Sequence, residues 1–141
     1  KAVLAGNLKP ILCVGESLEQ RDAGQTELVL KSQLEEGLNG VNSLQNVVIA
    51  YEPVWAIGTG VTASLEQVES AHHSVRKILD DLYPNSDDIH VLYGGSVNSG
   101  NAESLIQVSG VNGFLIGGAS LDVTTFTSII NNVENFQMRT L

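Results

Sequence analysis

Four short apolar runs, separated by segments of helical periodicity, constrain the fold of this chain more than any other feature of its sequence. The runs cover residues 11–14, 47–51, 89–93 and 113–116. The segments that follow them carry apolar residues at the spacing of amphipathic helices, over residues 26–38, 64–82, 102–108 and 123–133. This alternation predicts an α/β fold with parallel strands and right-handed helical crossovers, as in a doubly wound sheet or a (β/α)8 barrel.

The second predicted helix has the clearest boundaries. Ser64 is a favourable N-cap, Gln67 follows three residues later as in a capping box, and Pro84 stands just beyond the helix end. Four strand-helix units amount to half of a (β/α)8 barrel. No linker, low-complexity stretch or block of charge divides the chain, so we expect residues 1–141 to belong to one domain.

Composition limits the partners that this chain can have. It has 141 residues, of which 43% are hydrophobic and 16% charged, and this balance suits a globular interior. Its formal charge is −9 and its few basic residues are scattered, which makes nucleic acid and anionic membranes poor partners. No apolar stretch approaches the ~20 residues of a membrane span.

The single cysteine, Cys13, lies inside the first apolar run. A lone cysteine forms no internal disulfide, which favours a reducing compartment, and we expect a cytoplasmic protein. The apolar neighbours of Cys13 predict a small buried hydrophobe rather than a reactive thiol.

The residues just after the apolar runs are the candidates for a ligand site, because parallel α/β folds bind ligands where strands end and helices begin. Glu16 follows the first run after a glycine, and Glu52 follows the second directly. The third and fourth runs are followed by glycine pairs, Gly94-Gly95 before Ser96 and Gly117-Gly118. Backbone amides of such turns can hold an anion without a basic side chain. The sequence therefore predicts a site for a small phosphorylated ligand.

Glu52 has the sequence context of a catalytic base beside a mobile lid. Pro53 favours an extended backbone at Glu52, so the carboxylate is held at a strand end. The stiff stem Pro53-Val54-Trp55 is followed by Gly58 and Gly60, which permit a hinge and close approach of a ligand. A lone glutamate at a strand end is more often a capping or ion-paired residue. The apolar stem, however, would desolvate the carboxylate on lid closure and strengthen it as a base for proton abstraction next to a carbonyl.

The remaining polar candidates carry weaker signals. His72 and His73 are adjacent on a helix and point about 100° apart, which excludes a shared metal site and favours packing or surface roles. His90 has no metal-ligating neighbour at suitable spacing and receives no role. Glu16 is either a catalytic carboxylate or a structural hydrogen-bond acceptor, and the structural role is favoured.

Taken in order, four segments resemble the triosephosphate isomerase family. They are Cys-Val-Gly-Glu at 13–16, Ala-Tyr-Glu-Pro-Val-Trp-Ala-Ile-Gly-Thr-Gly at 50–60, Tyr-Gly-Gly-Ser-Val at 93–97, and Gly-Phe-Leu-Ile-Gly-Gly-Ala-Ser-Leu at 113–121. The resemblance implies that the chain is the second half, strands five to eight, of a (β/α)8 barrel. It also implies interconversion of dihydroxyacetone phosphate and glyceraldehyde 3-phosphate through an enediolate, a step of glycolysis and gluconeogenesis, without cofactor or metal.

The same resemblance assigns roles to individual residues. Glu52 corresponds to the catalytic base. The phosphate-binding positions are Gly58, Ser96, Gly117 and Gly118. The lid and its latch comprise Pro53, Val54, Trp55, Ala56, Ile57, Thr59, Gly60, Tyr93 and Glu16, with Glu16 accepting the Trp55 indole on closure. The family forms homodimers, so a homodimer is expected for the full-length enzyme.

The chain also departs from the family pattern. The family's first four strands supply an asparagine, a lysine and a histidine that polarise the substrate, and those motifs are absent from this sequence. Glu52 therefore lacks a partner to stabilise the developing oxyanion. Two alternatives remain open at this point, a non-catalytic half-barrel that binds a phosphorylated ligand or self-associates, and another phosphate-binding barrel enzyme.

Overall fold

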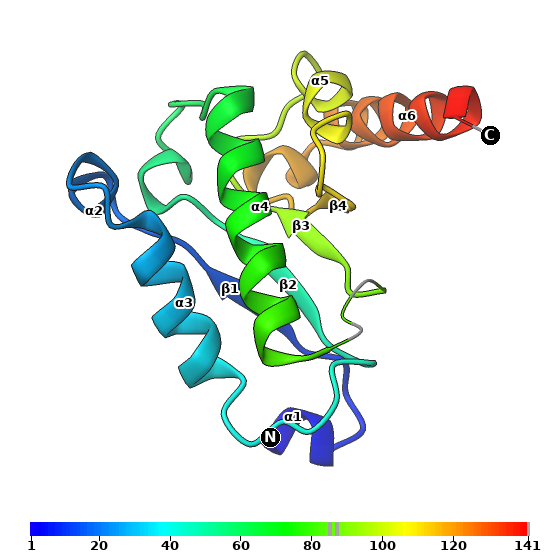
Figure 1. Cartoon of the computed structure of the whole chain (residues 1–141). Coiled ribbons are helices and arrows are strands. Elements are labelled where there is room, and N and C mark those ends of the chain that lie inside the picture. Colours follow the sequence, from blue (N-terminus) through cyan, green and yellow to red (C-terminus); the bar gives the residue numbers. More distant parts are fainter. Residues whose placement is uncertain (85, 87, 141) are drawn as a thin grey trace.

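The computed structural model describes residues 1–84, 86 and 88–140, and its centre is a parallel sheet of four strands (Figure 1). The strands lie side by side in chain order, β1-β2-β3-β4. Their bounds are Ile11–Val14, Val48–Tyr51, Val91–Tyr93 and Gly113–Phe114. Every neighbouring pair is parallel, with Cys13 opposite Ala50, Ala50 opposite Leu92 and Leu92 opposite Gly113. The fold is the predicted α/β arrangement of half a (β/α)8 barrel.

Helices connect the strands at the predicted places. The α-helices are α1 (Ala2–Ala5), α2 (Leu18–Asp22), α3 (Thr26–Gly37), α4 (Leu65–Leu82), α5 (Ala102–Ile106) and α6 (Val123–Thr140). Two short 3-10 helices follow strand ends, η1 (Val54–Ala56) and η2 (Gly118–Leu121). The helix α4 begins in the predicted capping box, in which the Ser64 and Gln67 side chains accept each other's backbone amides.

The structure differs from the sequence expectations at element ends. The last three strands are shorter than the apolar runs, and α6 extends beyond residue 133 to Thr140. The sequence reasoning missed α1, α2 and both 3-10 helices, because one or two helical turns are too short to show a periodic apolar stripe. A second capping box, between Ser17 and Gln20, was the available signal for α2.

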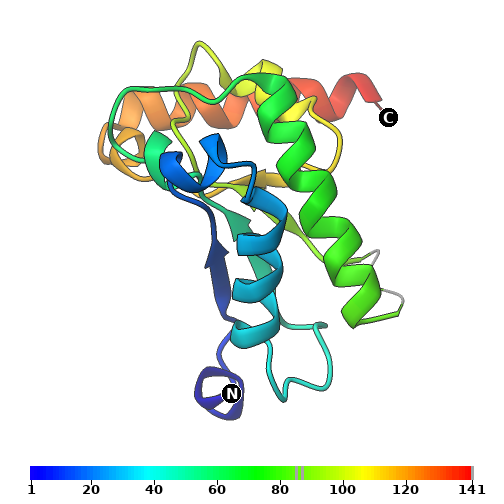
Figure 2. The same ribbon diagram turned by 60° about the vertical axis from the view of Figure 1, so that its left-hand side comes forward.

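The hydrophobic core lies between the sheet and the helices α3 and α4, which cover the same face of it (Figure 2). Leu30 and Leu34 come from α3, and Val68, Val75 and Leu79 come from α4, all fully buried. From the sheet they meet side chains such as Ile49, Tyr51, Val91 and Tyr93.

Among the residues that the structure describes, no helix covers the opposite face of the sheet, and this corrects one expectation. Side chains alternate between the two faces of a strand, so Ile11 and Cys13 share the face that turns away from the helices. Ile11 is 47% exposed, and Cys13 is exposed rather than the buried hydrophobe predicted from its apolar neighbours. In the described part of the chain, the edge strands β1 and β4 each pair on one side only.

Candidate functional site

Glu52 follows β2 directly and is held by the two neighbouring strands. Its amide donates to the Val14 carbonyl at 2.8 Å, which extends the β1–β2 pairing by one residue. A Cβ on Gly15 would stand 1.8 Å from the Glu52 carbonyl oxygen, so only glycine fits at that strand end. A Cβ on Gly94 would stand 2.6 Å from Glu52 Cγ, so the half-buried carboxylate side chain lies across the glycine that follows β3.

A cleft of about 410 Å³ opens beside this carboxylate. Its lining comes from the lid segment and from the turns after β3 and β4, and it includes Glu52, Gly58, Ser96, Gly117 and Gly118. The structure thus brings the predicted base and all four predicted phosphate-binding residues to one cavity. Its lining contains no lysine or arginine, so an anion would meet backbone amides and the Ser96 hydroxyl.

The lid segment begins as a compact turn and ends as an exposed loop. Pro53 is buried and is followed by η1, whereas residues 57–62 are exposed. Gly58 and Gly60 have φ values of 65° and 77°, in the left-handed region that favours glycine. Between them, the Thr59 hydroxyl donates to the Trp55 carbonyl at 3.0 Å and accepts from the Val61 amide at 3.2 Å.

Ser96, predicted to bind phosphate, and Tyr93, predicted to latch the lid, lie beside the two ends of the lid segment. The Ser96 hydroxyl donates to the Ala56 carbonyl at 2.9 Å. Burial raises the pKa of Tyr93 to about 12, and the nearby Ala63 amide opposes this rise. Across the residues that the structure describes, the buried Tyr93 hydroxyl has no partner at full hydrogen-bond geometry.

Glu16 is fully buried and accepts hydrogen bonds from three side chains, one of which belongs to the lid stem. One of its oxygens, Oε1, accepts from Tyr51 Oη at 3.1 Å, from Trp55 Nε1 at 3.2 Å and from Arg21 Nη1 at 2.8 Å. Burial, followed by the Glu16 charge, raises the pKa of Tyr51 well above its usual range. The sequence reasoning identified Glu16 and Trp55 but missed Arg21. The Ser17–Gln20 capping box, which starts a helix containing Arg21, was the signal that could have found it.

Cys13 and the histidines lie outside the cleft lining. Burial and the neighbouring Glu52 carboxylate raise the pKa of the Cys13 thiol to about 11. His72 is fully buried, and its Nδ1 lies 3.0 Å from the Gly110 carbonyl, so Nδ1 carries the proton. Burial lowers the pKa of His72 to about 4. His73 and His90 are exposed. The burial of His72 agrees with a packing role, and the exposure of His73 agrees with a surface role.

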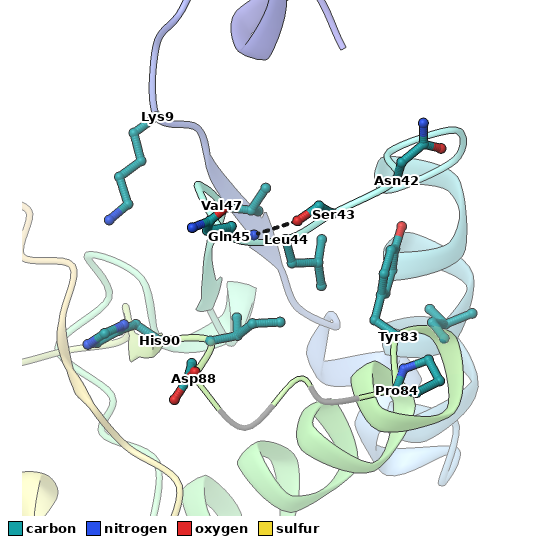
Figure 3. Close-up of a pocket in the computed structure, with 12 residues that line it drawn as sticks. Lys9, Asn42, Ser43, Leu44, Gln45, Val47, Tyr83, Pro84, Asp88 and His90 are labelled. Carbon is teal, nitrogen blue, oxygen red and sulfur yellow. Dashed lines mark hydrogen bonds between the residues drawn. The ribbon is translucent and has the colours of Figure 1, made fainter.

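A larger cavity, of about 670 Å³, opens at the other end of the strands (Figure 3). Its lining includes Lys9, Leu44, Val47, Tyr83 and His90. The Tyr83 hydroxyl is engaged by the Leu38 and Val41 carbonyls, at 3.1 and 2.9 Å. None of the predicted site residues reaches this cavity, because it lies at the amino ends of β2 and β3. The smaller cleft beside Glu52, which gathers the predicted residues, is therefore the candidate functional site.

The described part of the chain has neither a cluster of metal ligands nor a helix that could span a membrane. Within residues 1–84, 86 and 88–140, no three histidine, cysteine, aspartate or glutamate side chains are grouped as metal ligands. Over the same residues, no helix has the length and hydropathy required to cross a bilayer.

Comparison with known proteins gives the relationship of the chain. The sequence model of the family described as triosephosphate isomerase matches residues 1–133. The chain is 48% identical over 133 residues to the triosephosphate isomerase of Chlorobium phaeobacteroides strain BS1, covering 93% of this chain and 53% of the relative. It is 50% identical over 133 residues to that of Rhodopirellula baltica, covering 92% and 52%. It is 49% identical over 141 residues to that of Borreliella burgdorferi strain ZS7, covering 94% and 56%. The chain thus spans about half the length of these curated relatives, and it belongs to the triosephosphate isomerase family.

Proposed function

We propose that this chain supplies the base, the lid and the phosphate-binding turns of a triosephosphate isomerase. The enzyme interconverts dihydroxyacetone phosphate and glyceraldehyde 3-phosphate. The observation that carries this proposal is the single cleft in which the Glu52 carboxylate faces the glycine-rich turns after β3 and β4. A carboxylate at one end of a cleft and an anion-binding wall at the other suit a small substrate with a carbonyl at one end and a phosphate at the other.

In the proposed reaction, Glu52 removes the proton from the carbon next to the substrate carbonyl. The electrons of the broken C–H bond form the enediolate double bond, and the negative charge moves to the carbonyl oxygen. A proton then passes from the hydroxyl oxygen on the first carbon to the former carbonyl oxygen, and Glu52 returns its own proton to the neighbouring carbon. The first carbon thereby becomes the carbonyl carbon, and the product is an isomer with no net loss of protons or electrons. This family is the standard case of a glutamate base beside a neutral histidine under a water-excluding loop, and the assignment of Glu52 is inherited from it.

The lid contributes by keeping water from the intermediate. An enediolate in an open site loses its phosphate, and closure of residues 53–63 over the cleft suppresses that side reaction. Gly58 approaches the phosphate from the lid, while Ser96, Gly117 and Gly118 hold it from below. Because Ser96 also holds the Ala56 carbonyl, it links the phosphate-binding wall to the lid stem.

Activity requires a group that polarises the substrate carbonyl, and the cleft lining provides no cationic side chain for this. We propose that four further strand-helix units cover the open face of the sheet and bring these electrophiles opposite Glu52. Completion of the barrel would also pair the free edges of β1 and β4, which otherwise invite association with other chains. The family's homodimer and a cytoplasmic location are parts of the same proposal.

The test is isomerisation of glyceraldehyde 3-phosphate by the purified chain, alone and after co-refolding with a family first half that carries the lysine and histidine. Activity is expected only in the mixture. Glu52→Gln should lower it by about 10²–10⁴-fold, the usual contribution of a general base. Gln45→Glu, a change of similar size in an exposed loop, is the control and should have no effect. A refolded mixture without activity would contradict the proposal.

A second candidate function is the binding of a phosphorylated ligand by a non-catalytic half-barrel. The open sheet face and the two free strand edges favour it, because both are suited to self-association. It predicts dimers of this chain that bind dihydroxyacetone phosphate without turnover. Saturating isomerase kinetics from a monomer would exclude this second function.

A further inference from the structure

Arg21 contacts Glu16, Trp55 and Gln67 at the same time. Neither the predicted site nor the proposed mechanism uses this arginine. It lies in α2, five residues after Glu16, with 15% of its side chain exposed. Its Nη1 atom donates to Glu16 Oε1 at 2.8 Å, and its guanidinium carbon lies 5.4 Å from the centre of the Trp55 ring. Its Nη2 atom also reaches the Gln67 carbonyl in the first turn of α4, at 3.4 Å.

The first consequence concerns the charge of Glu16. A carboxylate with no exposed surface is stable only when a cation or several donors balance it. Arg21 is the cation paired with Glu16, while Tyr51 and Trp55 contribute neutral donors to the same oxygen. Without Arg21, Glu16 would be a buried carboxylate held only by neutral donors and would move toward water, so Trp55 would lose its acceptor.

The second consequence concerns the Trp55 ring itself. The guanidinium covers one side of the indole at cation–π distance, and the Glu16 carboxylate holds the indole N–H. One planar group therefore fixes both the acceptor and the ring. The bond to Gln67 ties this assembly to α4, the helix that begins directly after the lid segment.

We propose that Arg21 is a positioning residue for the lid, which holds the Trp55 stem against Glu16 and α4. This proposal takes its meaning for catalysis from the proposed function, but the contact that it concerns is measurable in the chain alone. Arg21 does not line the cleft, so its effect on the reaction would be exerted through Trp55.

The test uses the fact that the chain has one tryptophan, so indole signals report on Trp55 alone. Arg21→Met keeps much of the side-chain volume but removes the charge and the donors. We expect the indole proton of this variant to exchange with solvent about tenfold faster, as follows from losing a hydrogen bond to a charged group. Acrylamide should quench its fluorescence more strongly than in the wild type. Lys31→Met removes an exposed cation from α3 and should leave both signals unchanged.

Arg21→Lys separates charge from shape. Lysine keeps a cation near Glu16 but cannot cover the ring and reach Gln67 at the same time, so we expect indole exchange between the wild type and Arg21→Met. If Arg21→Met fails to fold, the Arg21→Lys variant provides the test. Indole-proton exchange at the wild-type rate in Arg21→Lys would then overturn the proposal. Wild-type exchange and quenching in a folded Arg21→Met would overturn it directly. Failure of the isomerase assay would leave these Trp55 signals unchanged, so the two proposals fail separately.

Discussion

The two faces of the β-sheet differ in what covers them, although the strands present apolar side chains on both faces. On the covered face, Leu30 and Leu34 of α3 and Val68 and Val75 of α4 are completely buried against the sheet. On the open face, Ile11 is 47% exposed and Cys13 is exposed. Apolar side chains on a strand therefore specify two contact surfaces, and the described helices of this chain cover one of them. The Glu52 carboxylate lies beside Cys13, on the open side of the sheet.

The largest expected effect contrasts core truncations on the two faces. Leu34→Ala should lower the free energy of unfolding by about 2–5 kcal/mol, since Leu34 is fully buried and the cavity that it leaves cannot close completely. Ile11→Ala, on the open face, should lower it by less than about 1 kcal/mol. Urea unfolding of both variants measures the difference. An equal loss for the two would mean that the open face is covered in solution, and sedimentation would identify a second copy as the cover.

A chemical probe sharpens the description of the open face. Cys13 is accessible, but burial of its sulfur region and the Glu52 carboxylate raise its pKa from 9.0 to about 11. At pH 8 the thiolate fraction, and with it the rate of alkylation by iodoacetamide, should be about 100-fold below that of an ordinary thiol. The rate should rise with pH until about pH 11. Glu52→Gln should accelerate alkylation at pH 8, and an unchanged rate in this variant would show that Glu52 does not face Cys13.

The covered face should respond to acid through His72. Its imidazole ring contacts the rings of Tyr51 and Tyr93, and its Nδ1–H donates a hydrogen bond to the Gly110 carbonyl. The positive charge of Arg76 lowers the pKa of His72 in addition to burial. The pKa is lowered from 6.5 to about 4, so the unfolded chain binds more protons between these values. Stability is therefore retained above pH 6.5 and lost as the pH falls toward 4, by roughly 2 kcal/mol between pH 7 and pH 4.5.

Urea unfolding at the two pH values measures this loss. His72→Gln should remove most of the difference between them, whatever it does to stability at pH 7. His73→Gln, one position along the same helix but exposed, is the matched control and should keep the wild-type difference. An undiminished pH dependence in His72→Gln would assign the effect to carboxylates.

The smallest expected effect lies at the outer rim of the covered face. Lys77 of α4 and Glu27 of α3 form an ion pair at 3.3 Å, with 60% and 61% of their side chains exposed. Solvent screens such pairs, so Lys77→Ala should change the free energy of unfolding by no more than about 0.5 kcal/mol. A loss comparable to that of Leu34→Ala would mean that the two helices depend on charge rather than on apolar packing.

Much of this architecture could be predicted from the sequence because the signals are local. Ser64 and Gln67 mark the start of α4, Pro84 stands two residues beyond its end, and each strand is an uninterrupted apolar run. The glycines beside Glu52 could also be predicted, because they follow strand ends that must meet at one edge of a parallel sheet.

The rest depends on contacts between distant residues. The exposure of Cys13 depends on whether anything covers its face of the sheet, which no neighbouring residue reveals. Arg21 was missed because its partners Trp55 and Gln67 stand 34 and 46 residues away, and only the fold brings them together. The position of the cleft that contains Glu52 could be predicted from the sequence. The hydrogen bond from the Ser96 hydroxyl to the Ala56 carbonyl was visible only in the structure.

The strict chain order of the four strands has a consequence for how the chain is made. Each of β2, β3 and β4 pairs with the strand synthesised just before it, and none of these pairs is separated by a strand inserted later. During translation, β1, α3 and β2 can therefore join as soon as they leave the ribosome, and each later unit adds to a surface that already exists. The growing edge of the sheet moves with the nascent chain, and Glu52 is in place before the glycine turns that face it have been synthesised.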